Sequence, residues 1–206
     1  MTQNSKKTLL DSDSAWTLYY VENRRITEND YHISTAEDVE KAGFASVPAR
    51  VPGNFERDLF RANIIPDLYL TDNVKIARDL EKYHIIYTRR FEFEGDEKGD
   101  VKLVFEGIDT AAEIFLNGVM MGECENMLIA HKFDCPSLRR GENELVVHII
   151  PASIAARKYT FDAGSRIHAY RTDAAYFRKA AHTYGWDIMP RILSGGIWRS
   201  CYIVEQ

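Results

Sequence analysis

The chain has 206 residues, a formal net charge of −5 and a hydrophobic content of 45%. These values allow a sizeable core in one large all-β domain or in two small ones. The acidic balance argues against nucleic acid and anionic membranes as partners, because both are bound by clustered Lys and Arg, and no apolar run is long enough to span a bilayer.

The start of the chain, residues 1–15, is polar and lacks the apolar segment of a signal peptide. We therefore expect a flexible leader and a cytoplasmic protein, with a removed targeting segment as the alternative. Cys124, Cys135 and Cys201 are odd in number and lack a metal-type spacing, which predicts free thiols. The six histidines form no i,i+4 pair and no group with cysteines, so neither a metal nor another cofactor is expected.

Four segments in the first third of the chain have periodic or capped patterns. Apolar side chains alternate over residues 16–21, which predicts a strand. Residues 47–53 are extended but interrupted by proline, so they are expected at a sheet edge or outside the sheet. Two short helices are predicted, over residues 36–42 and over residues 55–62, the second capped by Asn54. The apolar side chains of the second helix are expected to turn inward: Phe55, Leu59 and Phe60.

Residues 64–80 look irregular, and from residue 85 onward the chain alternates as β-strands do. Strands are predicted over residues 85–93, 101–106, 113–116, 119–121, 144–150 and 197–204. Asn117-Gly118 between apolar runs predicts a tight hairpin, because both positions tolerate positive φ. A short helix is expected over residues 173–181. Many short strands separated by turns are typical of an antiparallel β-sandwich or jelly roll, and without a repeat or linker we expect one domain over residues 16–206.

The segment 178–198 differs from the rest of the chain in composition. It gathers two Trp, a Tyr, an Asp, three basic side chains and three Gly. Glycine permits backbone angles that other residues avoid, and proline fixes φ and removes a hydrogen-bond donor. The segment is therefore predicted to form an irregular loop that holds aromatic and charged groups in one geometry.

Asp187 is the candidate binding residue of this loop. It directly follows Trp186, and a carboxylate beside an aromatic face suits a carbohydrate: the oxygens accept two hydroxyls while the ring covers the apolar C–H surface. The structural alternative is that Asp187 caps a turn or pairs with Arg178 or Arg191. Trp186 likewise has two interpretations, a platform for a sugar or a packed core residue.

The same segment resembles the end of the N-terminal domain of family 2 glycoside hydrolases, most closely in the β-mannosidase branch. The matching sequences are Arg178-Lys179-Ala180, Gly185-Trp186-Asp187, Pro190-Arg191 and Gly196-Ile197-Trp198-Arg199. Weaker marks follow the order of the family: Val51-Pro52-Gly53, Asp58-Leu59, Ile65-Pro66-Asp67, Asp72-Asn73, Gly107-Ile108-Asp109-Thr110, Leu116-Asn117-Gly118, Asn126 and Gly141-Glu142-Asn143-Glu144-Leu145. The resemblance covers about residues 47–204. Ile188 and Met189 stand where the branch carries Trp and Gly, so a β-galactosidase or β-glucuronidase parent remains open.

The resemblance implies a galactose-binding-like jelly roll that serves as the N-terminal accessory domain of a retaining β-glycosidase. It implies that Asp187 reaches into the pocket of a TIM barrel and binds a terminal β-linked sugar, with Trp186 nearby and Arg178, Tyr184 and Arg191 supporting the loop. The partners would be carbohydrate and downstream immunoglobulin-like and TIM-barrel domains of the same polypeptide. The two catalytic Glu of the family belong to that barrel, a fold of about 250 residues. We therefore expect a fragment of a larger enzyme that is inactive alone.

Two other functions remain open. A free-standing carbohydrate-binding module without hydrolase activity would bind sugar by itself and carry a preformed, exposed aromatic platform. A sandwich used only for protein–protein packing would carry a large exposed apolar patch.

Overall fold

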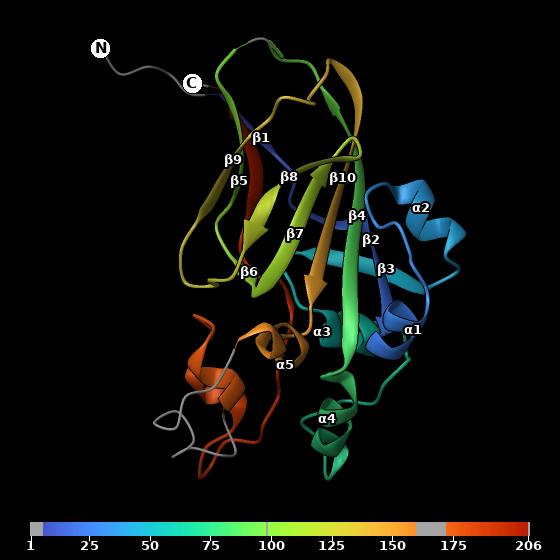
Figure 1. Cartoon of the computed structure of the whole chain (residues 1–206), viewed down its shortest axis with the longest axis vertical. Coiled ribbons are helices and arrows are strands. Elements are labelled where there is room, and N and C mark those ends of the chain that lie inside the picture. The colour runs from blue at the N-terminus through green and yellow to red at the C-terminus, as the bar shows by residue number, and fades with distance from the viewer. Residues whose placement is uncertain (1–5, 98, 160–171, 206) are drawn as a thin grey trace.

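The computed structural model describes residues 6–97, 99–159 and 172–205, which form two antiparallel β-sheets with a shared core (Figure 1). The larger sheet has the order β3-β2-β4-β10-β7-β8 and the smaller has the order β1-β12-β5-β9. The strands of the larger sheet are β2 Ser12–Glu22, β3 Ala45–Val51, β4 Tyr83–Phe93, β7 Ala111–Leu116, β8 Val119–Cys124 and β10 Gly141–Ile150. Those of the smaller are β1 Lys6–Leu9, β5 Val101–Phe105, β9 His131–Asp134 and β12 Cys201–Glu205, and a separate pair is β6 Ile108–Asp109 with β11 Gly196–Ile197. The predicted antiparallel β-sandwich is confirmed.

The main core lies between the two sheets and consists of side chains that alternate along their strands. Trp16 of β2 and Tyr87 of β4 meet edge to face, with ring centroids 6.4 Å apart. The indole Nε1 of Trp16 donates a hydrogen bond to the carbonyl oxygen of Leu10 at 2.7 Å, so the ring is buried without an unsatisfied polar atom. Leu103 and Phe105 of β5 enter the same core from the smaller sheet. The two-residue period of the sequence thus selects the side chains that fill the sandwich.

The helices are short, and two of them begin at side-chain caps. They are α1 Asn23–Glu28, α2 Ala36–Lys41, α3 Phe55–Arg61, α4 Ile76–Leu80 and α5 Ala152–Ala155, with 3₁₀ turns η1 Asn73–Lys75, η2 Ala156–Lys158, η4 Thr172–Ala175 and η5 Ala181–Tyr184. Helix α2 begins with a capping box between Thr35 and Asp38. At the start of α3, Asn54 Oδ1 accepts a hydrogen bond from the backbone N–H of Arg57 at 3.2 Å. Both predicted helices are confirmed, and none of the helices in the described ranges is long and apolar enough to cross a membrane.

The outer face of the larger sheet is covered as well. Tyr19, Val21 and Ile86 on that face are buried in a second cluster with Val39 of α2 and with Phe44. Helices α1 and α2 lie beside this face in Figure 1. Strand β4 is therefore buried on both faces over residues 84–88, whereas Arg90 and Glu92 in its second half are exposed.

Residues 6–15 are not a flexible leader, which corrects the expectation from the sequence. Strand β1 pairs with β12, with Lys6 opposite Glu205, and β2 already begins at Ser12. Leu10, between the two strands, is buried in the main core. The first five residues lie outside the described part of the chain. Because the partner of β1 comes from the other end of the sequence, the local pattern of residues 6–15 does not predict this pairing.

Several element boundaries also differ from the prediction. Phe60 is 41% exposed rather than turned inward, and the segment predicted as irregular contains α4. The helix expected over residues 173–181 is replaced by the two 3₁₀ turns η4 and η5, and the last strand is split into β11 and β12. The predicted hairpin at Asn117-Gly118 is confirmed, with φ of 51° and 77°. The three cysteines are free, as predicted, and all three are buried.

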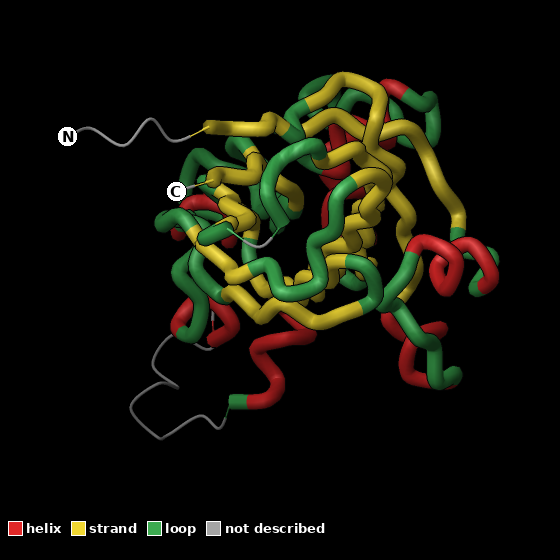
Figure 2. The backbone as a smooth tube through the Cα atoms, turned by 90° about the horizontal axis from the view of Figure 1, so that it is seen from above, coloured by secondary structure: helices red, strands yellow, loops and turns green. Residues whose placement is uncertain are grey.

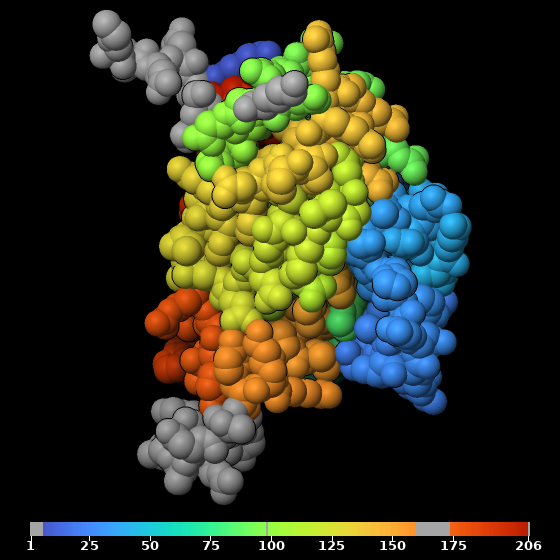
Figure 3. All heavy atoms as spheres, turned by 45° about the horizontal axis from the view of Figure 1, so that its top comes forward, coloured from blue at the N-terminus to red at the C-terminus, as the bar shows by residue number. Residues whose placement is uncertain are grey.

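One end of the sandwich carries most of the irregular structure. Helices α3, α4 and α5 gather there with the segment 178–196, at the end remote from the pairing of Lys6 with Glu205 (Figure 1). Seen down the long axis, the strands form the centre of the molecule and several helices lie around them (Figure 2). The space-filling view shows the surface of α5 and η2 bordering that of the segment after residue 173 (Figure 3), where Phe177 packs against Ala156. The rest of the fold therefore acts as a scaffold for this end.

Candidate functional site

The tip of the segment 178–196 is a small hairpin. The backbone N–H of Trp186 donates to the carbonyl of Met189 at 2.9 Å, and the N–H of Met189 donates back to the carbonyl of Trp186 at 3.2 Å. Asp187 and Ile188 occupy the turn between them. Trp186 is 66% exposed and Ile188 is 86% exposed, so the hairpin, residues 186–189, projects from the sandwich. Trp186 is therefore not a core residue.

Asp187 is exposed and makes no hydrogen bond or ion pair within the described ranges. The pairing with Arg178 or Arg191 that was considered from the sequence does not occur there. An acidic side chain at an exposed turn, beside a solvent-facing indole, keeps all its acceptor positions available for a ligand.

Arg191 anchors the hairpin to helix α4. Its Nε and Nη2 atoms each donate to one oxygen of the Glu81 carboxylate at 2.8 Å, and its guanidinium lies 5.4 Å from the ring centroid of Tyr184. The backbone N–H of Ile192 donates to the carbonyl of Thr183 at 2.9 Å, which joins the two arms of the hairpin, the residues directly before and directly after residues 186–189. A bidentate Arg–carboxylate pair fixes orientation as well as distance. The supporting roles of Tyr184 and Arg191 stay a prediction from the sequence. Glu81, the acidic partner of Arg191, was not found from the sequence.

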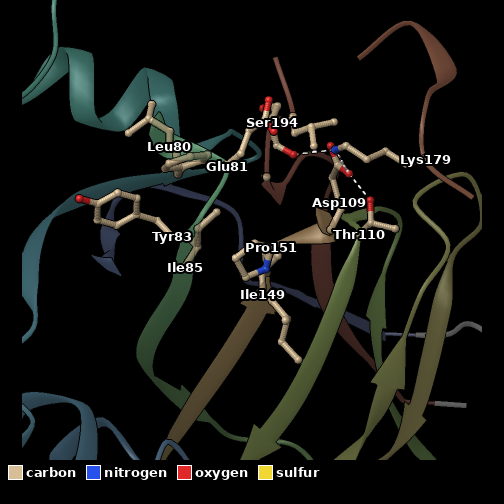
Figure 4. A pocket seen from close by; sticks show the side chains of 15 residues that line it. Leu80, Glu81, Tyr83, Ile85, Asp109, Thr110, Ile149, Pro151, Lys179 and Ser194 are labelled. Carbon is tan, nitrogen blue, oxygen red and sulfur yellow. Dashed lines mark hydrogen bonds and ion pairs between the residues drawn. The ribbon is translucent and has the colours of Figure 1, made fainter. Parts of the chain in front are cut away.

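A buried ion pair holds the base of the segment. Lys179 Nζ lies 2.5 Å from Asp109 Oδ1 and donates a second hydrogen bond to the carbonyl of Ser194 at 2.6 Å. The Ser194 hydroxyl donates to Glu56 Oε2 at 2.8 Å and accepts a hydrogen bond from Asn54 Nδ2 at 3.1 Å. Figure 4 shows Asp109, Lys179 and Ser194 converging beside a cavity of about 20 Å³, enough for about one water molecule. Asp109, expected from the sequence to fix a turn, is thus half of a buried charge pair.

Burial changes the acidity of the carboxyl in this network. Removal from water raises the pKa of Glu56 to about 7, against the opposing effects of the Ser194 hydroxyl and the Lys179 ammonium. At neutral pH, this carboxyl therefore lies near the midpoint of its titration.

A cleft of about 520 Å³ lies between α3, residues 67–69 and the arms of the hairpin. Its lining includes the polar side chains of Arg57, Asp67 and His182 and the larger apolar side chains of Phe60, Tyr69 and Met189. Its volume lies within the roughly 300–1,000 Å³ of small-molecule sites. The cleft was not anticipated from the sequence, because it is formed by three segments that are remote along the chain.

The remaining predicted support residue, Arg178, does not hold the hairpin through its side chain. That side chain is exposed and has no ion pair in the described part of the protein. The backbone carbonyl of Arg178 accepts a hydrogen bond from the N–H of Met127 at 3.0 Å. Its neighbour Lys179 supplies the buried charge instead. Within the described ranges, no group of three or more His, Cys, Asp and Glu side chains has the geometry of a metal site.

Comparisons with known proteins agree with the fold and with the sequence marks. The model of the family described as "Glycosyl hydrolase 2 galactose-binding domain-like" matches residues 26–199. The β-mannosidase of Capra hircus is 30% identical over 172 residues, which is 78% of this chain and 20% of that protein. The β-mannosidase B of Aspergillus terreus is 31% identical over 170 residues, covering 80% of this chain and 20% of that protein.

Among solved structures, the β-D-mannosidase of Dictyoglomus thermophilum aligns with a TM-score of 0.71 at 30% identity. The alignment covers 96% of this chain and 22% of that one. The chain thus spans about a fifth of the length of the relatives that it matches.

Proposed function

Because the chain belongs to the glycosyl hydrolase 2 galactose-binding domain-like family, we propose that its hairpin presents Asp187 to the terminal sugar of a β-linked substrate. The relatives that carry this domain are multidomain β-mannosidases. In the proposed arrangement, a downstream TIM barrel packs on the hairpin end of the sandwich and supplies the two catalytic carboxyls. An immunoglobulin-like domain lies between the two in the polypeptide. The carboxylate of Asp187, which has no partner among the described residues and lies at the tip of an anchored hairpin, carries this proposal.

The geometry of the hairpin supports such a role. A carboxylate can accept hydrogen bonds from two neighbouring hydroxyls of one sugar, and the adjacent Trp186 ring can cover apolar C–H groups. The pair of Arg191 with Glu81 and the pair of Lys179 with Asp109 restrain the arms of the segment, so little conformational entropy is lost when the tip engages a ligand. The exposed side chain of Ile188 at the same tip also suits a surface that another domain covers.

The reaction of the whole enzyme would be hydrolysis, in which water adds across the glycosidic bond and releases the terminal sugar and an alcohol. In a retaining mechanism, two carboxyls about 5–5.5 Å apart act as acid/base and nucleophile. The residues of this chain would bind and orient the sugar. A hydrogen bond from a ring hydroxyl to Asp187 contributes to the rate insofar as it strengthens in the transition state.

The test uses the full-length product of the gene with a panel of nitrophenyl β-glycosides that includes the mannoside, galactoside and glucuronide. We expect Asp187→Ala to lower kcat/KM about a hundredfold on the glycoside that is cleaved, because a charged acceptor is lost. Leu70→Ala is the control, since it shortens an exposed apolar side chain that lies outside the hairpin. Equal activity of Asp187→Ala and the wild-type protein would remove Asp187 from the site.

A free-standing carbohydrate-binding module is the second candidate, favoured by the exposed aromatic side chains of Trp186 and Tyr69. It requires measurable sugar affinity from residues 1–206 alone. Titration of monosaccharides and β-linked oligosaccharides against this chain tests it, and heat release that Trp186→Ala abolishes would favour the module over the accessory domain.

A further inference from the structure

The cleft of about 520 Å³ adjoins the hairpin that carries Asp187. Met189 of the hairpin and Pro190, which follows it, form part of the wall of the cleft. The opposite side is formed by α3 and residues 67–69. Consecutive units of a glycan are covalently linked, so a site for a second unit must lie next to the site for the first. The cleft occupies such a position relative to Asp187.

The apolar lining of the cleft suits the faces of a sugar ring. Tyr69 is 80% exposed, and Phe60 and Met189 are also large apolar side chains left in contact with solvent. Pyranose rings present C–H groups on their faces, and an open aromatic ring is a surface on which such a face can pack. These side chains are costly to expose unless a ligand or partner covers them.

The polar lining supplies hydrogen-bond donors and acceptors for hydroxyl groups. The side chains of Arg57 and His182 make no hydrogen bond or ion pair within the described ranges, so their N–H groups are available. Asp67 Oδ1 accepts a hydrogen bond from the backbone N–H of Tyr69 at 2.9 Å, which fixes the turn that carries Tyr69. The second carboxylate oxygen of Asp67 has no hydrogen-bond donor among the described residues, so it can accept one from a ligand.

This mixture of groups favours a sugar over other ligands. A phosphorylated ligand would meet the carboxylate of Asp67 as well as the single guanidinium of Arg57, and the like charge of Asp67 disfavours it. An apolar protein segment would bury Arg57 and Asp67 without hydrogen-bond partners, which costs free energy. A hydroxyl both donates and accepts, so a sugar can satisfy both residues.

We propose that this cleft binds the leaving-group sugar of the substrate, the unit attached to the terminal sugar that Asp187 contacts. This inference rests on the proposed function and adds to it a second sugar subsite on the same domain. It makes the parent enzyme selective for oligosaccharides over glycosides that lack a second sugar.

The test compares two substrates of the full-length gene product that share the terminal sugar. One is a β-linked disaccharide, and the other is the β-glycosyl fluoride, which has no leaving-group sugar. The measured quantity is the ratio of kcat/KM for the disaccharide to kcat/KM for the fluoride. We expect Tyr69→Ala to lower this ratio about tenfold and Arg57→Gln to lower it about threefold, in line with a lost aromatic contact and a lost hydrogen bond.

Leu70→Ala is the matched control, because Leu70 is an exposed neighbour of Tyr69 that does not line the cleft, and it should keep the wild-type ratio. If both cleft variants keep the wild-type ratio, the proposal is wrong. This includes the case in which kcat/KM falls equally on the two substrates, which would indicate that a segment of protein fills the cleft. Asp187→Ala separates the two proposals: it should lower kcat/KM on both substrates. If Asp187→Ala lowers both values while Tyr69→Ala leaves the ratio unchanged, the cleft inference fails and the proposed function stands.

Discussion

The ammonium of Lys179 lies 2.5 Å from a carboxylate oxygen of Asp109, and these side chains are only 1% and 7% exposed. Lys179 lies at the start of the segment 178–196 and Ser194 near its end, and the ammonium also donates a hydrogen bond to the carbonyl of Ser194. The buried ammonium of Lys179 therefore connects the start and the end of this segment to Asp109 of β6.

Replacement of Lys179 should destabilise the fold strongly. Lys179→Met leaves the carboxylate of Asp109 buried without its partner, so we expect a loss of about 3–5 kcal/mol in the free energy of unfolding. Urea denaturation measures it. Lys75→Met, which removes an exposed ion pair with Asp72, is the control and should change the midpoint little. Similar midpoints for the two variants would show that the buried pair stabilises the fold no more than the exposed pair does.

Replacement of Arg191 should loosen the hairpin without unfolding the domain. Arg191→Lys removes the bidentate contact to Glu81 and the stacking on Tyr184, because an ammonium cannot reproduce the planar fork. We expect faster hydrogen exchange at the amides of Trp186 and Met189. Arg178→Lys is the control, since that side chain makes no ion pair in the described structure, and it should leave exchange unchanged. Equal protection in both variants would contradict the anchoring role.

Glu56 should make the protein less stable as the pH rises from about 4.5 to about 7. Its folded-state pKa of about 7 lies above the ordinary 4.5, so within this window the folded protein keeps a proton that the unfolded chain releases. The contribution is complete below about pH 4.5 and decreases by up to about 3 kcal/mol by pH 7. Glu56→Gln keeps the shape and cannot titrate. Unfolding curves at several pH values should therefore show a flatter profile for the variant, and parallel profiles would argue against a shifted Glu56.

His84 should make the protein less stable as the pH falls from about 6.5 to about 3. Burial, with His148 as a second cause, lowers its pKa from 6.5 to about 3, and its ring nitrogens lie 2.8 Å from His148 Nε2 and 3.0 Å from Asn23 Oδ1. Between pH 6.5 and 3, the unfolded chain binds a proton that the folded protein does not. Stability should decrease as the pH falls through this window, by up to about 4 kcal/mol. His84→Gln should flatten that decrease in acid titrations followed by circular dichroism, and an unchanged decrease would assign it to other groups.

The sequence by itself determined the local structure and the family. Alternation over residues 85–93 selects the inward face of β4, because successive side chains of a strand point to opposite sides. Asn117-Gly118 determines a tight turn, and Asn54 determines where α3 begins, since each acts on atoms within a few residues. The composition of residues 178–198 also predicted an irregular loop that carries Trp186 and Asp187, although not the hairpin at its tip.

Only the tertiary structure decided how the candidate site is held together. The contacts of Lys179 with Asp109, Glu81 with Arg191 and Glu56 with Ser194 join residues 70, 110 and 138 positions apart. No short-range pattern encodes such pairs, because the backbone brings them together only after the sheets have packed. The same holds for β1 beside β12 and for the cleft next to the hairpin, whose walls come from three separate segments. Local interactions thus shaped the individual elements, whereas burial of charge and contacts between remote segments placed Asp187 at an exposed and anchored tip.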